Sequence, residues 1–473
     1  MSSIFEVLTS IDIFNIVTVN THYLALAAFG MAACGGKGGG GCSCGHDHGD
    51  GAEDDEEDSV YAEMESEIEA LKEKVEGGDK SARRNLADAY LALAVQLQQD
   101  DYLEESISMF DDSLELFDAL AKELPSDDSI ARLIGAANLS RAIALNDSDE
   151  KEEVIEGYNR AEKAVSALAA SGDGEAKYDL AGIKLNRGTV YCELGEFDKA
   201  QKELDESFDE FRALEKISEL DTRYFMAKVS VALGNLYREQ DAPVNKIVDV
   251  YNRAMRLFVE LIDAGDMKYE LDLANVLVDK CMARYEAGEG EAVLVDMQRG
   301  IDIIEKCAKE SNEIASLDLF SAMSAYGIML LDLEKFNDAL SVFDETIEKF
   351  KLFEHLDNPI LLNDYASLYD NRGMCLINLK RNDEAIESLG KAIEMRESFW
   401  TEEWDLDDDQ LAQFAPHLVS AYCNRAYVYD STGKRDLAVD DCKKAMNALE
   451  PYADDLGKEY DELCKQIKEI QNG

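Results

Sequence analysis

The chain has 473 residues, 46% of them hydrophobic, so it can bury a core in several domains or in one long repeat array. Its 100 acidic residues outnumber its 47 lysines and arginines, giving a formal net charge of -53. This charge argues against nucleic-acid partners and anionic membrane surfaces, and it leaves basic proteins, basic peptides or cations as compatible partners. Solubility or a high-salt habitat would also account for it. Only 5 prolines interrupt the chain, which favours an all-α fold.

Residues 1–33 contain an apolar run over residues 23–33 that is too short to span a bilayer, which needs about 20 apolar residues. Acidic residues precede the run and no Lys or Arg does, so it is a poor secretory signal. Met31–Cys34 resembles a degenerate bacterial lipobox, which would make the chain a lipid-anchored exported protein tethered at Cys34. A targeting segment and a packed N-terminal helix are the alternatives. We expect membrane association only through this segment.

Residues 34–58 are rich first in Gly, Cys and His and then in acidic residues, and we expect a flexible linker. Four potential metal ligands stand at alternate positions in it: Cys42, Cys44, His46 and His48. Thiolates and imidazoles suit zinc or copper, and four of them can close a tetrahedral site. A Gly-rich backbone offers no outer hydrogen bonds to fix that geometry. The segment is therefore either a spacer without a cofactor or a metal-binding or redox tag.

From residue 59 to residue 473, apolar residues recur with the 3.6-residue period of amphipathic helices. A small residue recurs about every 46 residues in the first helix of each predicted pair. Its positions are Ala94, Ala142, Gly188, Gly234, Gly327, Gly373 and Ala426, with Lys280 in the weak fifth place. A polar turn, Lys380–Asp383, separates the two helices of the best-formed unit. Such a constant spacing predicts a helical repeat array.

One pattern recurs along the array: a small residue, then a Gly at the turn, then an Ala with an aromatic or long apolar residue. The sequence matches this pattern best around Gly188, Gly327, Gly373 and Ala426. In this pattern the chain resembles the tetratricopeptide-repeat (TPR) family over about residues 85–452. The resemblance implies a right-handed α-solenoid of about eight antiparallel helix pairs, with residues 453–470 as a capping helix. The family's usual unit has about 34 residues, so each helix should be about 9 Å longer here. The unit around Lys280 should pack irregularly.

The resemblance also places ligand-binding residues on a concave face, at fixed positions around the small residue of each first helix. The candidates at these positions are Asn186, Asn235, Arg238, Asp370, Asn371, Met374, Asn424 and Tyr427. Asparagine can donate to and accept from a peptide backbone, although it can also cap local packing. The basic residues that clamp a carboxylate in some family members are missing here. We therefore expect a scaffold for a basic or neutral protein or peptide.

We find no catalytic constellation in the sequence and expect a protein that is not an enzyme. No phosphate-binding glycine loop follows a predicted strand, and His355 and His417 are isolated residues, expected on the surface or between helices. Seven cysteines stand singly at apolar or small positions of the repeats, which is typical of buried thiols in a reducing compartment. A cytoplasmic location follows, with the bacterial envelope as the alternative if Cys34 carries lipid.

Overall fold

The computed structural model describes residues 53–472 apart from residues 101, 147–150, 216–221, 310–312, 352–357, 402, 403 and 405. This described part is helical and contains no strand. It divides into two compact units, with unit 1 ending at Gly265 and unit 2 beginning at Asp266. The segment 1–33, most of the predicted linker 34–58, and the residues Cys34, Cys42, Cys44, His46 and His48 lie outside the described residues.

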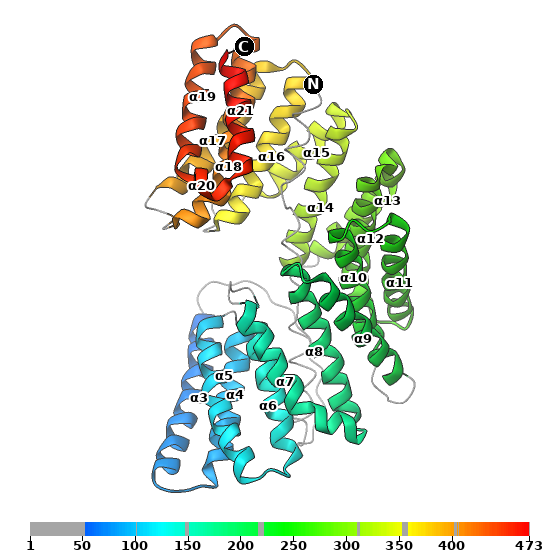
Figure 1. Ribbon diagram of the computed structural model, residues 1–473, viewed down its shortest axis with the longest axis vertical. Coiled ribbons are helices and arrows are strands. Elements are labelled where there is room, and N and C mark those ends of the chain that lie inside the picture. The colour runs from blue at the N-terminus through cyan, green and yellow to red at the C-terminus, as the bar shows by residue number, and fades with distance from the viewer. Residues whose placement is uncertain are drawn as a thin grey trace. The chain divides into compact units, whose positions relative to one another are not determined.

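Unit 1 consists of α3 (Glu53–Glu76) followed by four antiparallel helix pairs (Figure 1). The pairs are α4 (Ala82–Gln99) with α5 (Leu103–Glu123), α6 (Asp128–Ala144) with α7 (Lys151–Ser171), α8 (Gly174–Glu193) with α9 (Phe197–Leu214), and α10 (Arg223–Glu239) with α11 (Val244–Asp263). The second helices α5, α7 and α9 also pack against the first helices of the pairs that follow them. Helix α3 begins at Glu53, earlier than the predicted residue 59, because acidic residues in a first turn favour the positive end of the helix dipole.

Unit 2 has four further pairs. They are α12 (Glu270–Arg284) with α13 (Leu294–Ala308), α14 (Glu313–Asp332) with α15 (Phe336–Lys349), α16 (Pro359–Asn378) with α17 (Asn382–Glu397), and α18 (Asp408–Ser431) with α19 (Arg435–Leu449). The predicted capping helix is two helices, α20 (Ala453–Leu456) and α21 (Lys458–Asn472), separated by Gly457 with a positive φ of 51°. Helix α21 packs against α18 and α19 and covers the end of the stack.

The recurring small residue lies where a large side chain of the second helix reaches the first helix. A Cβ atom on Gly188 would stand 2.9 Å from Leu204, and one on Gly327 would stand 2.5 Å from the ring of Phe343. Leu204 and Phe343 are fully buried. The repeat read from the sequence is therefore a packing requirement, and the predicted helix pairs are confirmed.

The unit around Lys280 keeps this close approach by placing the small residue on the other helix. A Cβ atom on Gly300 of α13 would lie 2.9 Å from Val278 of α12. The connection between the two helices is irregular, with a π-helical turn, Tyr285–Glu289, followed directly by a 3₁₀ turn, Gly290–Val293. The deviation in sequence thus marks a real local change in how this pair is joined.

We expect Gly327→Ala to lower the free energy of unfolding of unit 2 by about 1–3 kcal/mol, because the added Cβ overlaps the buried ring of Phe343. Both tryptophans of the chain, Trp400 and Trp404, lie in unit 2. Urea denaturation followed by tryptophan fluorescence therefore measures the stability of this unit.

The matched control is Gly390→Ala in α17, where the nearest atom to a new Cβ is Arg425 Nη1 at 3.6 Å, an ordinary contact distance. Alanine should raise the stability there by up to about 1 kcal/mol through its helix propensity. Equal effects of the two substitutions would contradict a close-packing role for Gly327.

Candidate functional site

Several first helices of neighbouring pairs touch one another within each unit. In unit 1, α4 contacts α6 and α8 contacts α10, and in unit 2 α12, α14, α16 and α18 follow one another in contact. Side chains at the same repeat position therefore form rows across these helices. We call the surface formed by α16 and α18 the inner face of unit 2.

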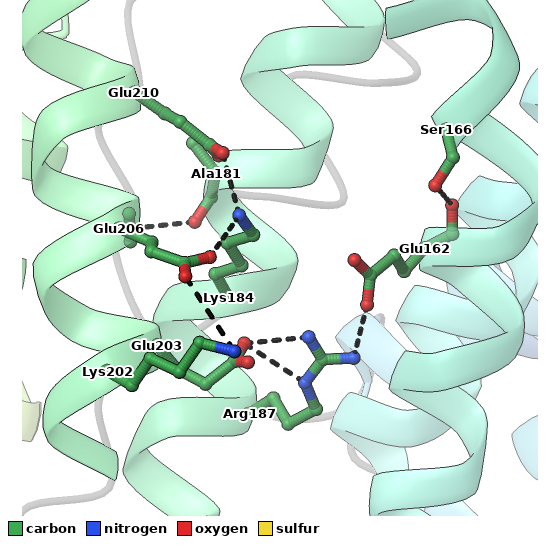
Figure 2. A network of polar contacts seen from close by, with 10 residues as sticks. Glu162, Ser166, Ala181, Lys184, Arg187, Lys202, Glu203, Glu206 and Glu210 are labelled. Atoms are coloured by element: carbon green, nitrogen blue, oxygen red, sulfur yellow. Dashed lines mark hydrogen bonds and ion pairs between the residues drawn. The ribbon is translucent and has the colours of Figure 1, made fainter. Parts of the chain in front are cut away.

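The arginine of the recurring Asn-Arg-small motif forms ion pairs with neighbouring helices, so it does not contribute a free side chain to a ligand-binding surface. Arg187 is buried, and its guanidinium lies 2.7 Å from Glu203 of α9 and 2.6 Å from Glu162 of α7, as Figure 2 shows. The equivalent Arg372 reaches Asp344 at 2.6 Å and Arg425 reaches Asp441 at 2.8 Å. This part of the motif is structural.

A second buried base of α8 reinforces the same contact between α8 and α9. Lys184 donates at 2.7 Å to both Glu206 and Glu210 (Figure 2). The hydrogen bond from Lys184 holds the pKa of Glu206 below its usual range. Burial raises the pKa of Glu210, against the opposing effect of Lys184. The network holds α8 against α9, and it occupies both Lys184 and Arg187, so neither is available to a ligand.

The predicted site residues of unit 1 are largely engaged or covered. Asn186 is only 4% exposed, and its Nδ2 has no hydrogen-bond partner among the described residues. The Oδ1 atom of Asn235 accepts a hydrogen bond of 2.7 Å from the Tyr251 hydroxyl, which fits a packing role. Arg238 lies half-buried on α10. Of these three residues, Asn186 is buried, and Asn235 and Arg238 are half-buried.

In unit 2, Asp370 belongs to a buried polar cluster around Arg396, a residue that sequence reasoning missed. Arg396 is 1% exposed and donates to Asn363 Oδ1 and to Ser367 Oγ, both at 2.8 Å, and it forms an ion pair with Asp370. The second carboxylate oxygen of Asp370, Oδ1, is buried without a partner among the described residues. Burial raises the pKa of Asp370, opposed by Arg396.

Two further groups on the inner face of unit 2, Asp364 and His417, were not among the predicted site residues. They occupy the same repeat position, nine residues before the small residues Gly373 and Ala426. Burial raises the pKa of Asp364 to about 6 and lowers the pKa of His417 to about 3, with Arg396 as the nearby charge in both cases. Neither side chain has a hydrogen-bond partner in the described part of the chain. His417 is thus neutral and lies between helices.

Four predicted residues share the inner face with them. Asn371 and Asn424 are equivalent positions two residues before the small residue, and Met374 and Tyr427 are equivalent positions one residue after it. Both asparagines are half-buried and lack a side-chain hydrogen bond to any described residue. Tyr427 is 53% exposed. The structure therefore brings these four together on two touching helices of unit 2.

The described residues include no group of three or more His, Cys, Asp or Glu side chains placed to hold a metal ion. None of the seven cysteines described forms a disulfide, and burial raises the pKa of Cys281 to about 11 and that of Cys423 to about 12. Such thiols stay protonated and are poor nucleophiles and ligands. Among the described helices, none combines the length and apolarity needed to cross a membrane.

Residues 366–399 and 419–448 match the family model of the tetratricopeptide repeat; these ranges include Asn371 and Asn424 but not Asp364 and His417. No curated protein sequence matches the chain significantly. Among solved structures, the apo form of RapI matches with a TM-score of 0.51 at 14% identity, covering 71% of this chain and 85% of that chain. The apo form of the quorum sensor NprR from B. thuringiensis matches with a TM-score of 0.41 at 12% identity, covering 80% and 99%.

At 14% identity the likeness to RapI concerns the fold alone. The eight helix pairs, the close contacts at the recurring small residues and the two matched repeats agree with that fold. The chain is a TPR-like helical repeat protein.

Proposed function

We propose that the chain is a non-catalytic scaffold that binds an extended segment of a protein partner on the inner face of unit 2. Stacked helix pairs typically present such surfaces to partners. One observation carries the proposal: Asp364 and Asn371 on α16 are matched by His417 and Asn424 on α18, and none of these four side chains has a partner among the described residues. Polar groups held half-buried without partners are suited to a ligand's hydrogen bonds.

The spacing of these groups fits an extended backbone. The seven residues from Asp364 to Asn371 span about 10.5 Å along the helix, and packed helices lie about 8–10 Å apart. An extended peptide rises about 3.3 Å per residue, so about three residues cross from Asn371 to Asn424. Each asparagine can both donate to and accept from the peptide backbone, which recognises the chain direction and not a particular side chain.

The charge of the surface favours a basic side chain in the ligand. The half-buried Asp364 has no hydrogen-bond partner among the described residues, and the nearby Arg396 is already engaged by Asn363, Ser367 and Asp370. The net charge of -53 attracts cations from a distance and raises association rates at low salt. We therefore propose that the bound segment carries Lys or Arg beside Asp364.

We also propose a cytoplasmic location for the chain. The seven described cysteines form no disulfide, which suits a reducing compartment.

Selection of a phage-displayed random peptide library on the full chain tests the proposal. Selected peptides should be enriched in Lys or Arg, and fluorescence anisotropy should show binding that weakens by about tenfold in Asn424→Ala, because one or two hydrogen bonds of about 0.5–1.5 kcal/mol are lost. Asn371→Ala should have a similar effect.

The matched control is Asn447→Ala, the same substitution at an exposed position of α19 in the same helix pair. It should leave peptide binding within about twofold of the wild type, a difference below 0.5 kcal/mol by the same conversion, about 1.4 kcal/mol per factor of ten. Peptides that bind Asn424→Ala as tightly as the wild type would show that the inner face is not the binding surface.

A further inference from the structure

An arginine of unit 1 lies partly buried without a carboxylate partner. The guanidinium of Arg253 on α11 donates through Nε to Ser230 Oγ at 2.9 Å and lies 4.0 Å from the ring centroid of Phe208 on α9. Its Nη2 is buried and has no hydrogen-bond acceptor in the described part of the chain. Burial lowers the pKa of Arg253, whereas the pKa of the ion-paired Arg187 is raised.

In the preceding helix pair, the position equivalent to Arg253 belongs to an ion pair, which Arg253 lacks. Lys184 stands four residues before Gly188, and it forms an ion pair with Glu206 of the second helix. In the next pair the same position, four residues before Gly234, is Ser230, and the second helix supplies Arg253 in place of a glutamate. An ion pair at one repeat is thus replaced by a single positive charge at the next.

Two further arginines act on Arg253, in a chain whose formal net charge is -53. Arg212 lies 5.9 Å from the same Phe208 ring centroid, and both Arg212 and Arg256 lower the pKa of Arg253 further. Arg256 is exposed and makes no ion pair with a described residue. Asp205 raises the pKa of Arg253 more than either arginine lowers it, and Asp209 forms an exposed ion pair with Arg212 at 2.7 Å.

We propose that Arg253, with Arg212, Arg256 and the Phe208 ring, binds a carboxylate of an acidic segment in a protein partner. A partly buried guanidinium is destabilising unless an anion pairs with it, and a carboxylate oxygen can accept from Nη1, because Nε is bonded to Ser230 and Nη2 is buried. Three arginines set against Asp205 and Asp209 leave about one unbalanced positive charge, which a singly charged carboxylate neutralises and a phosphate dianion exceeds. The Phe208 ring provides an apolar wall beside the charge. This surface is distinct from the inner face of unit 2.

The test is a phage-display selection on the full chain with counter-selection against Arg253→Met, which retains only peptides that depend on the guanidinium. These peptides should share an Asp or Glu at one fixed position, and the amide analogue at that position should bind about tenfold more weakly. Circular dichroism of Arg253→Met should match that of the wild type. Arg253→Lys, which keeps the charge and loses the planar guanidinium, should bind with an intermediate affinity.

Arg299→Met is the matched control, because Arg299 is an exposed arginine of unit 2 and its loss changes the net charge equally. It should leave the binding of these peptides unchanged, as should Asn424→Ala, so the result is independent of the inner face. Survivors without a shared acidic residue, or none at all, would overturn the proposal. Displacement of the peptides by inorganic phosphate at concentrations where acetate has no effect would overturn the carboxylate assignment.

Discussion

Replacing Arg396 with methionine is expected to lower the free energy of unfolding of unit 2 by about 3–5 kcal/mol near neutral pH. Arg396 is 1% exposed, and its guanidinium bonds to Asn363 and Ser367 as well as to Asp370. Methionine fills a similar volume but leaves the carboxylate of Asp370 buried with both oxygens unpaired. Urea denaturation followed by the fluorescence of Trp400 and Trp404 reports on this unit.

Two variants separate the buried charge from the loss of packing. Adding Asp370→Asn to Arg396→Met removes the uncompensated charge and should restore most of the stability. Arg381→Met is the matched control: Arg381 forms its ion pair with Glu384 at the surface, where both side chains are more than a third exposed, so its loss should change stability by no more than about 0.5 kcal/mol. Equal losses from Arg396→Met and Arg381→Met would show that the cluster is not buried as described.

The helix pairs could be predicted from the sequence because each of them needs the same close approach. Gly188, Gly327 and Gly373 recur for a packing reason, and the turn after Asn378 is where the apolar pattern stops. The division after Gly265 could not be predicted, because the helical period continues on both sides of it. The fifth pair was recognised as irregular, but its compensating Gly300 lies on the second helix, outside the position used for alignment.

The sequence points to only part of the proposed binding surface. Asn371 and Asn424 were selected as candidates because they hold a fixed place beside the small residue. Asp364 and His417 were missed because their repeat position varies, with Phe225 occupying it in α10. A comparison of that position across all pairs would have shown the polar residues of unit 2.

The buried arginines are harder to predict. In the sequence Arg396 looks like any surface arginine of a second helix, and its burial depends on three residues of another helix. The absence of a carboxylate beside Arg253 likewise depends on contacts between three helices, α9, α10 and α11. Periodicity locates a residue on one helix face but does not say what the neighbouring helices supply.

Asp364→Asn is expected to stabilise unit 2 near neutral pH by up to about 3 kcal/mol, with the gain disappearing in acid. Burial raises the pKa of Asp364 from 3.8 to about 6 in the folded chain, against the opposing charge of Arg396. The stability that this carboxyl contributes is therefore fully present below pH 3.8 and is lost as the pH rises through about 6. Asparagine has no such ionisation, so the variant and the wild type should begin to differ above pH 3.8 and should differ fully above about pH 6.

On the neighbouring helix, His417→Gln should change the stability of unit 2 with the opposite pH dependence. Burial lowers the pKa of His417 from 6.5 to about 3, so its contribution to stability is present above pH 6.5 and is lost as the pH falls toward 3. Glutamine should therefore stabilise unit 2 only in acid. Tryptophan fluorescence in urea at a series of pH values measures both variants, and a pH-independent effect of Asp364→Asn would mean that this carboxyl is well solvated in the fold.

The same titration connects stability to the proposed function. The Asp364 carboxylate destabilises unit 2 near neutral pH and is also the group proposed to hold a basic side chain. A bound Lys or Arg should therefore stabilise the ionised form of Asp364 and offset the cost of burying its charge. A lysine-bearing peptide should consequently bind less tightly as the pH falls through about 6, where Asp364 becomes protonated. Asp364→Asn should remove this pH dependence, whereas Asn447→Ala should retain it. Binding that is equally tight on both sides of that pH would place the basic side chain elsewhere.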